Sequence, residues 1–221
     1  MMIKGIIFDL DGTLLNTIDD MNNSVNDTYA YFGYEKRNTV PETMSMVGHG
    51  MKNLITQCFP GNDEEFILKA LDVFLNFYDK QYYKITAPYP GVVDMVNELI
   101  KKGYKVGVNS NKNHNYTRHL IELNFPNIDQ DYVTGVRPGD ATKPDPANVN
   151  RVIKTMGLTK DQILYVGDSP TDFQTSQNAG TRFCGVSWGF RSKEKIMAAG
   201  AGKVVDTAEE LSAYCEGENE I

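Results

Sequence analysis

Pairs of aspartates stand at two places where a short apolar run ends. Asp9 and Asp11 follow the first apolar run of the chain, and Asp168 and Asp172 follow a later one. Two carboxylates this close repel each other unless a cation or a reaction holds them together. A single aspartate at such a place is commonly only a turn or helix-capping residue. A pair after an apolar run therefore favours a functional role over a structural one.

A hydroxyl and an ammonium group stand at two further turns. Ser110 and Asn111 follow another apolar run, where backbone N–H groups at a helix start can bind an anion. Both types are also ordinary capping and turn residues, so this pair alone does not decide the matter. Lys143 stands just before a predicted helix and is followed by Pro144 and Pro146. A lone lysine is usually solvated, and these rigid neighbours make a fixed ammonium more plausible.

Six short apolar runs, separated by helical patterns, predict buried parallel strands that would position these residues. The runs are residues 3–8, 104–108, 132–133, 163–166, 183–186 and 204–205. Helices are predicted between them, over residues 91–102, 113–124, 146–156 and 170–179. The alternation of strand and helix predicts a doubly wound, Rossmann-like α/β fold with a parallel sheet.

One long stretch after the first aspartate pair interrupts this alternation. It has helical spacing, many Tyr and Phe residues and no convincing strand. Four of its residues recur at helical intervals and predict one apolar helix face: Leu68, Leu71, Leu75 and Tyr78. One helix suffices to connect two parallel strands, so this length predicts a separate helical insert. We expect residues 17–86 to form a helical domain, and residues 1–16 and 87–221 the α/β core.

The carboxyl ends of parallel strands meet at one edge of a sheet, where ligands collect in open α/β folds. Asp9, Asp11 and Asp168 should therefore converge beside Ser110 and Lys143. Three carboxylates around one point require a hard cation, and an all-oxygen ligand set favours Mg²⁺. The lysine and the hydroxyl remain to hold a phosphate group. The residues by themselves thus predict a magnesium site beside a phosphate site.

Composition bounds the partners and the compartment. The 221 residues carry a net charge of −7 without a basic run, which argues against a nucleic-acid partner. Cys58, Cys184 and Cys215 are far apart and form no metal-binding pair, as expected in a reducing compartment. No apolar stretch approaches the ~18–20 residues of a membrane span. We expect a cytoplasmic protein without membrane or nucleic-acid partners, either a monomer or a homodimer.

Four motifs, taken in order, resemble those of the haloacid dehalogenase (HAD) superfamily. They are Asp9-Leu10-Asp11-Gly12-Thr13, Ser110-Asn111, Lys143-Pro144-Asp145-Pro146 and Gly167-Asp168-Ser169-Pro170-Thr171-Asp172. Together they cover nearly the whole chain, and the helical insert resembles the cap domain of the subclass that carries it after the first motif. Shorter pieces resemble the phosphoglycolate phosphatase branch: Val47-Gly48-His49-Gly50, Trp188-Gly189-Phe190-Arg191-Ser192, Ala199-Gly200-Ala201 and Asp206.

The resemblance implies a catalytic role for each acidic motif residue. Asp9 would be the nucleophile that forms an aspartyl-phosphate. Asp11 would act as general acid for the leaving group and then as general base for water. Mg²⁺ would be held by the Asp9 carboxylate, the main-chain oxygen of Asp11 and Asp168. Asp172 would steady the metal-binding loop or a bound water molecule.

The resemblance also implies how the substrate is held. Four residues would bind the transferring phosphate: Thr13, Ser110, Asn111 and Lys143, of which Lys143 also takes part in catalysis. In the cap, His49 and Lys52 lie in or beside a glycine-flanked loop and are candidates for substrate contact. A surface or helix-capping role explains His49 equally well, and Lys52 is more simply a solvated residue.

These residues predict a Mg²⁺-dependent phosphatase of a small phosphorylated metabolite, with phosphoglycolate as the leading candidate. A pyrophosphatase, a nucleotide or sugar-phosphate phosphatase and a sugar phosphomutase would use the same core. Outside the enzymes, a receiver-like module that accepts a phosphoryl group also places aspartates and a lysine at strand ends. The helical insert and Asp11 argue against that module, because a general acid/base promotes turnover that a signal must avoid.

Overall fold

The computed structural model describes residues 2–217 and divides into two compact units. One contains the described residues up to Leu15 and from Pro88 onward, and the other is Asn16–Ala87. The chain passes between them at β2 (Leu15–Asn16) and β3 (Ala87–Pro88), which pair as a two-stranded sheet. The assignment of residues 17–86 to a cap domain stays a prediction.

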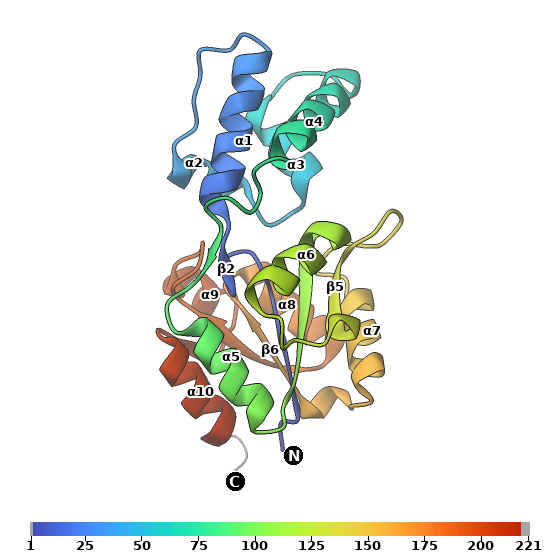
Figure 1. Ribbon diagram of the computed structural model, residues 1–221, viewed down its shortest axis with the longest axis vertical. Helices are drawn as coiled ribbons and strands as arrows, with labels where there is room; N and C mark the ends of the chain where they lie inside the picture. The colour runs from blue at the N-terminus through green and yellow to red at the C-terminus, as the bar shows by residue number, and fades with distance from the viewer. Residues whose placement is uncertain (1, 218–221) are drawn as a thin grey trace. The chain divides into compact units, whose positions relative to one another are not determined.

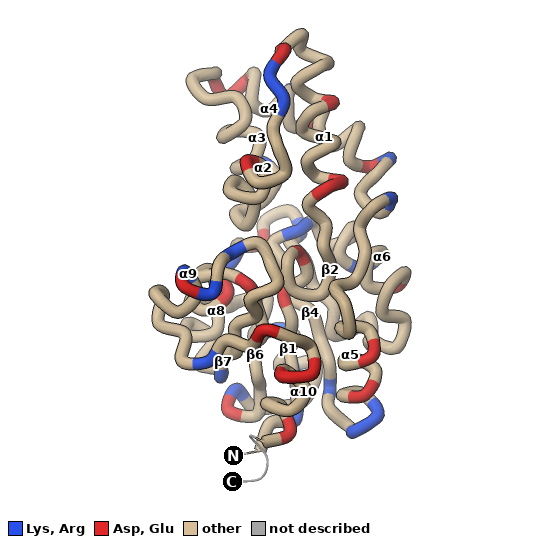
Figure 2. Tube along the Cα trace, turned by 90° about the vertical axis from the view of Figure 1, so that its left-hand side faces the viewer, with Lys and Arg blue, Asp and Glu red and all other residues tan. Residues whose placement is uncertain are grey.

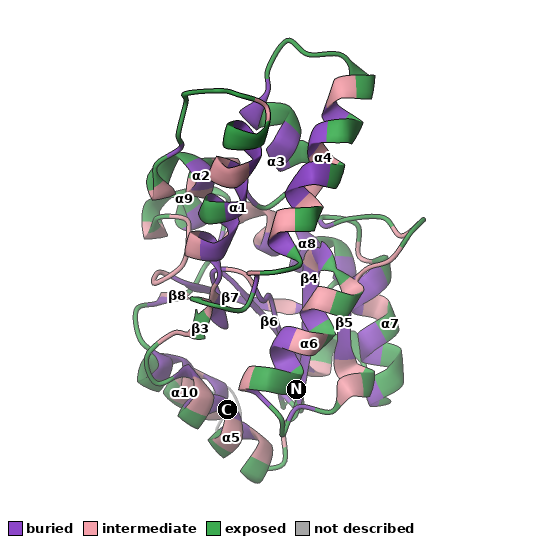
Figure 3. Ribbon diagram, turned by 45° about the horizontal axis from the view of Figure 1, so that its top comes forward, coloured by how far each residue is buried: buried purple, intermediate pink, exposed green. Residues whose placement is uncertain are grey.

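The first unit is built on a six-stranded parallel sheet (Figure 1). In spatial order its strands are β5 (Val133–Val136), β4 (Lys105–Asn113), β1 (Gly5–Phe8), β6 (Ile163–Gly167), β7 (Arg182–Val186) and β8 (Val204–Val205). The central strands β1 and β6 are buried along their whole length, as expected when helices cover both faces of a parallel sheet; of the two, Figure 3 labels β6. The predicted doubly wound α/β fold is confirmed.

Helices connect these strands and cover the sheet. They are α5 (Val92–Lys101), α6 (His114–Asn124), α7 (Ala147–Met156), α8 (Pro170–Ala179), α9 (Lys193–Ala198) and α10 (Ala208–Gly217), with short 3₁₀ turns η1 (Gln130–Tyr132) and η2 (Lys160–Gln162). Helices α5 and α10 lie side by side (Figure 1), and α8 packs against both α7 and α9. Apolar side chains from α7–α9 and from β1, β6 and β7 form one buried cluster. That burial is the main force that holds the sheet and these helices together.

The second unit consists of four helices. They are α1 (Ile18–Tyr31), α2 (Val40–Met46), α3 (Met51–Cys58) and α4 (Glu64–Tyr78). Helix α4 packs against α1 and α3, and the rings of Tyr29, Phe59 and Phe66 meet between them at centroid distances of 5.0–5.5 Å. Within residues 2–217, no helix is both long and apolar enough to cross a membrane.

The buried face of α4 differs from the sequence prediction. Leu68 is 50% exposed, so its place on the predicted face is wrong. The buried side chains are instead Ile67, Ala70, Val73, Phe74 and Tyr78, with the rings of the last two stacked. Apolar residues cover more than half of the circumference of α4, so spacing alone does not identify the stripe that packing against α1 and α3 selects.

Asp20 fixes the segment by which the chain leaves the helical unit. Its side chain lies in the first turn of α1 and is only 1% exposed as a residue. One carboxylate oxygen accepts hydrogen bonds from the backbone N–H groups of Ile85 at 3.0 Å and Thr86 at 2.8 Å. Hydrogen bonds to a charged group are worth more than neutral ones, so Asp20 ties this segment to α1.

Replacing Asp20 should release that segment. We expect Asp20→Ala to destabilise the helical unit by about 2 kcal/mol, because two backbone donors lose a charged acceptor. Hydrogen exchange followed by NMR should show the amides of Ile85 and Thr86 losing protection. The control Asp19→Ala changes the same residue type in the same helical turn and should leave both amides protected. Unchanged protection in Asp20→Ala would contradict the assignment.

Candidate active site

The ends of three neighbouring strands bring the predicted residues to one edge of the sheet. Phe8 of β1 is in register with Val108 of β4 and Val166 of β6, so Asp9 leaves the sheet between those two strands. Its backbone N–H donates to the Val166 carbonyl at 2.8 Å, which extends the parallel pairing to the aspartate itself. Asp168 follows the end of β6 in the same way.

A buried cluster of charges forms at this edge. One carboxylate oxygen from each of Asp9, Asp168 and Asp172 lies within 4.8 Å of the others. The Lys143 ammonium lies 2.8 Å from the Asp9 carboxylate and 2.7 Å from that of Asp172. Charged residues of both signs are spread along the chain (Figure 2), so burial, rather than surface charge, distinguishes this cluster.

Burial controls the ionisation of the cluster. Together with the neighbouring Asp172 carboxylate, it raises the pKa of Asp168 to about 7 and the pKa of Asp9 well above its ordinary value. Burial alone would lower the pKa of Lys143, but the carboxylates of Asp172 and Asp9 outweigh it and raise that pKa. Three carboxylates thus share one ammonium, a deficit of positive charge that a divalent cation would balance.

The loop after β7 holds Asp168 in place. The backbone N–H of Phe190 donates to one Asp168 oxygen at 2.6 Å, and the Thr13 hydroxyl contacts the other at 3.4 Å. The indole N–H of Trp188 donates to the Thr13 carbonyl at 3.0 Å, so this loop also fixes the turn after β1. A Cβ atom at Gly189 would overlap Asp168, which requires glycine there.

Gly12 gives the turn after β1 its shape. Its φ of 87° lies in the left-handed region that favours glycine. A Cβ atom at Gly12 would also overlap the Asp168 carboxylate. The glycine therefore lets the two acidic turns approach each other closely.

Asn111 supports Lys143. Its side-chain oxygen accepts a hydrogen bond from the Lys143 backbone N–H at 2.7 Å, and its amide nitrogen contacts the Lys143 carbonyl at 3.4 Å. Ser110 is 2% exposed, and its hydroxyl accepts a hydrogen bond from the backbone N–H of Lys112. Asn111 is predicted to bind phosphate. In the structure, its side-chain amide is hydrogen-bonded to the backbone of Lys143.

Comparison with known proteins places this geometry in a family. The sequence model of the haloacid dehalogenase-like hydrolase family matches residues 6–186 of this chain. The chain belongs to this family. The phosphoglycolate phosphatase of Rhodospirillum rubrum is 31% identical over 214 residues, which cover 93% of this chain and 88% of the relative. That of Aliivibrio fischeri is 29% identical and covers 96% of each chain.

Solved structures agree with this assignment. A protein from Lactobacillus delbrueckii subsp. bulgaricus, proposed to be a phosphoglycolate phosphatase, superposes with a TM-score of 0.91 at 30% identity. The match covers 97% of this chain and 99% of that one. The resemblance to HAD enzymes of the phosphoglycolate phosphatase branch, and the prediction of a hydrolase of the phosphatase class, are confirmed.

Asp11 stands apart from the acidic cluster of this haloacid dehalogenase-like hydrolase. Its carboxylate lies 2.7 Å from the ammonium of Lys112, a residue to which the sequence motifs assign no role. A second residue without a predicted role is Ser169, whose hydroxyl donates to the Asp172 carboxylate at 2.5 Å. Ser169 is also the N-cap of α8, and that place before Pro170 is the sequence signal that could have identified it.

The two cap candidates lie in the helical unit. His49 is exposed, and Lys52 is paired with the exposed carboxylate of Glu64. Their contact with substrate stays a prediction.

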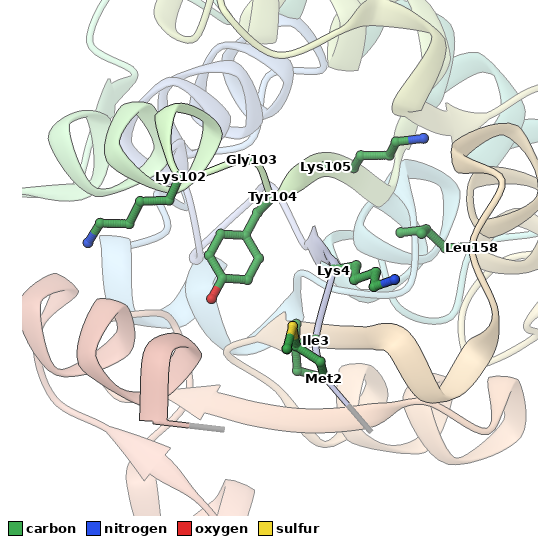
Figure 4. A pocket seen from close by; sticks show the side chains of 8 residues that line it. All are labelled: Met2, Ile3, Lys4, Lys102, Gly103, Tyr104, Lys105 and Leu158. Atoms are coloured by element: carbon green, nitrogen blue, oxygen red, sulfur yellow. The ribbon is translucent and has the colours of Figure 1, made fainter. Parts of the chain in front are cut away.

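A hollow lies at the opposite, amino-terminal edge of the sheet. Its volume is about 340 Å³, and Figure 4 shows its lining, which includes Lys4, Lys102, Tyr104 and Lys105. In this view the Lys102 side chain runs away from those of Lys4 and Lys105; Lys102 is paired with Glu216, and Lys105 donates to the Met156 carbonyl. Among residues 2–217, none that lines this hollow is a carboxylate or a cysteine, so the described lining offers no nucleophile of those kinds.

The raised carboxyl pKa values predict how Mg²⁺ affects stability. A folded-state pKa above the unfolded value means that the metal-free protein holds a proton that the unfolded chain has released. Its stability should therefore fall as pH rises from about 4 to about 7. A cation can replace that proton, so Mg²⁺ at about 100 times its Kd should raise Tm by about 5–10 °C at pH 8 and much less at pH 5. Thermal unfolding with Mg²⁺ or EDTA measures this.

Two variants control the experiment. Asp168→Asn should lose the stabilisation by Mg²⁺, because it removes a carboxylate of the cluster. Asp161→Asn makes the same change at an exposed position of η2 and should keep it. Equal Mg²⁺ effects at the two pH values, or in Asp168→Asn and the wild type, would contradict the assigned site.

Proposed function

We propose that this protein is a Mg²⁺-dependent phosphatase that hydrolyses 2-phosphoglycolate through a phosphorylated Asp9. The observation that carries the proposal is the buried Lys143 ammonium, which bridges Asp9 and Asp172 inside a group of three carboxylates. A nucleophilic carboxylate, a cation deficit and a fixed ammonium at one point are what transfer of an anionic phosphoryl group requires.

The residues at the site fit a magnesium ion. The three clustered carboxylates offer hard oxygen ligands, and only one buried ammonium balances them. The Asp9 and Asp168 carboxylates, together with the main-chain oxygen of Asp11, would hold the ion. Asp172, bound by Lys143 and Ser169, would support it. When bound, Mg²⁺ would cancel the repulsion between an anionic nucleophile and an anionic phosphate.

The first half-reaction transfers the phosphoryl group to the protein. A carboxylate oxygen of Asp9 attacks phosphorus, and the bond between phosphorus and the substrate's ester oxygen breaks. Asp11 gives a proton to the departing alkoxide. Lys143, Ser110 and nearby backbone N–H groups stabilise the charge that spreads over the phosphate oxygens, and Thr13 helps to place them.

The second half-reaction restores the protein. Asp11, now without its proton, takes one from a water molecule that attacks phosphorus. The bond between phosphorus and the Asp9 oxygen breaks, inorganic phosphate leaves and the Asp9 carboxylate is regenerated. The proton that Asp11 gave away in the first step is thereby recovered.

The names of the relatives support phosphoglycolate as the substrate. The match with this chain covers at least 88% of the length of each of the two phosphoglycolate phosphatases compared above. We infer further that the helical unit acts as a cap domain that selects the substrate. We also propose a cytoplasmic location, which is supported by three buried cysteines that form no disulfide.

A substrate panel tests the proposal. Phosphate release from 2-phosphoglycolate, pyrophosphate, a sugar phosphate and a nucleoside monophosphate should be fastest for 2-phosphoglycolate and should stop in EDTA. Asp9→Asn should retain less than about 10⁻³ of the wild-type rate, because an amide cannot act as the nucleophile. Asp161→Asn should keep full activity.

Two outcomes would overturn the proposal. Substantial hydrolysis by Asp9→Asn would exclude Asp9 as the nucleophile. Failure of the folded, Mg²⁺-loaded protein to release phosphate from any of the four, unless a sugar bisphosphate is added, would favour the phosphomutase alternative.

A further inference from the structure

A second buried ammonium lies at the proton-transferring carboxylate. The Lys112 side chain is 1% exposed, and its Nζ atom lies 2.7 Å from Oδ1 of Asp11, whose own side chain is 18% exposed. Among residues 2–217, Lys112 and Lys143 are the lysines that are buried. Each is paired with one carboxylate of the first motif, Lys143 with Asp9 and Lys112 with Asp11.

The backbone of β4 is bent to deliver Lys112 to this place. Asn109 pairs with Thr134 and Asn113 with Val136, so β4 uses two more residues than β5 over the same stretch. Such a bulge re-aims the side chains that it contains. The Ser110 hydroxyl accepts a hydrogen bond from the backbone N–H of Lys112 at 3.1 Å. The Thr117 hydroxyl of α6 contacts the Lys112 carbonyl.

Gly135 lets the bulge pack against β5. A Cβ atom at this position would overlap the Lys112 carbonyl and the Thr117 hydroxyl. Lys112 is thus held by its backbone on two sides before its side chain reaches Asp11. Its buried side chain has fewer accessible rotamers than a surface lysine, so forming the ion pair costs it less conformational entropy.

We propose that Lys112 is a positioning residue that orients the Asp11 carboxylate toward the leaving-group oxygen of the substrate. The inference rests on the proposed function, because it assigns Lys112 to the proton transfer that Asp11 performs there. The two buried lysines then have different roles. Lys143 acts at the phosphoryl group and its acceptor Asp9, whereas Lys112 acts through Asp11 on the group that departs.

The leaving group of the substrate distinguishes this role from phosphate binding. An alkoxide is a poor leaving group and needs a proton as the ester bond breaks, whereas 4-nitrophenolate leaves without one. Loss of a residue that orients Asp11 should therefore harm alkyl esters selectively. Loss of a phosphate ligand, or of local structure, should harm alkyl and aryl esters equally, because both substrates share the phosphate.

The experiment compares kcat/KM for 2-phosphoglycolate and 4-nitrophenyl phosphate in the full-length, Mg²⁺-loaded protein. This constant covers the steps up to transfer of the phosphoryl group to Asp9. We expect Lys112→Met to lower kcat/KM for 2-phosphoglycolate by about 10²-fold or more and that for the aryl ester by less than about 5-fold. Lys112→Arg should recover part of the loss. Lys105→Met, the same change at the other end of β4, should alter neither value.

A double-mutant cycle shows whether Lys112 acts through Asp11. In an Asp11→Asn background, Lys112→Met should cost less than about 3-fold on 2-phosphoglycolate, because the carboxylate that it orients is already gone. Equal losses on the two esters in Lys112→Met, or additive effects in the cycle, would overturn the proposal. If Lys112→Met fails to fold, the same ester comparison on Lys112→Arg decides, with selective loss on the alkyl ester expected. Wild-type protein that hydrolyses neither ester would instead overturn the proposed function.

Discussion

Three carboxylates buried around one ammonium are the constraint on which this structure depends. Placing Asp9, Asp168 and Asp172 together away from water raises the free energy of the metal-free fold, and Lys143 offsets only part of it. A protein selected for stability alone would place apolar residues there. The cluster is therefore interpreted as a functional site. A bound cation would balance its negative charge and allow an anionic substrate to bind.

The rest of the α/β unit holds these charges at fixed positions. Parallel pairing of β1 with β4 and β6 brings the strand ends together, and Asp9 itself continues that pairing. Further contacts support them: the Phe190 N–H binds Asp168, and the Asn111 side-chain amide binds the backbone of Lys143. Preorganised support of this kind lets charged groups act without rearranging during the reaction.

Much of this arrangement could be predicted from the sequence, because it follows from the order of strands. Short apolar runs ending in Asp9 or Asp168 identify strand ends, and parallel strands bring those ends together whatever the details of packing. Lys112 could not be identified in this way. The run that ends at Val108 gives no sign that β4 continues to Asn113 through a bulge, and the bulge is what brings Lys112 to Asp11. The predicted buried face of α4 is wrong at Leu68 for a related reason. Apolar residues lie on more than one side of α4, and packing against neighbouring helices determines which of them are buried.

The central claim is that Asp9 carries the phosphoryl group between substrate and water, and the most direct test is to trap it there. Protein mixed with ³²P-labelled 2-phosphoglycolate and Mg²⁺, quenched in acid within milliseconds and digested, should yield a labelled peptide that contains Asp9. Hydroxylamine should release the label, as it does from an acyl phosphate. Turnover without a labelled peptide, or label on a peptide that lacks Asp9, would contradict the mechanism.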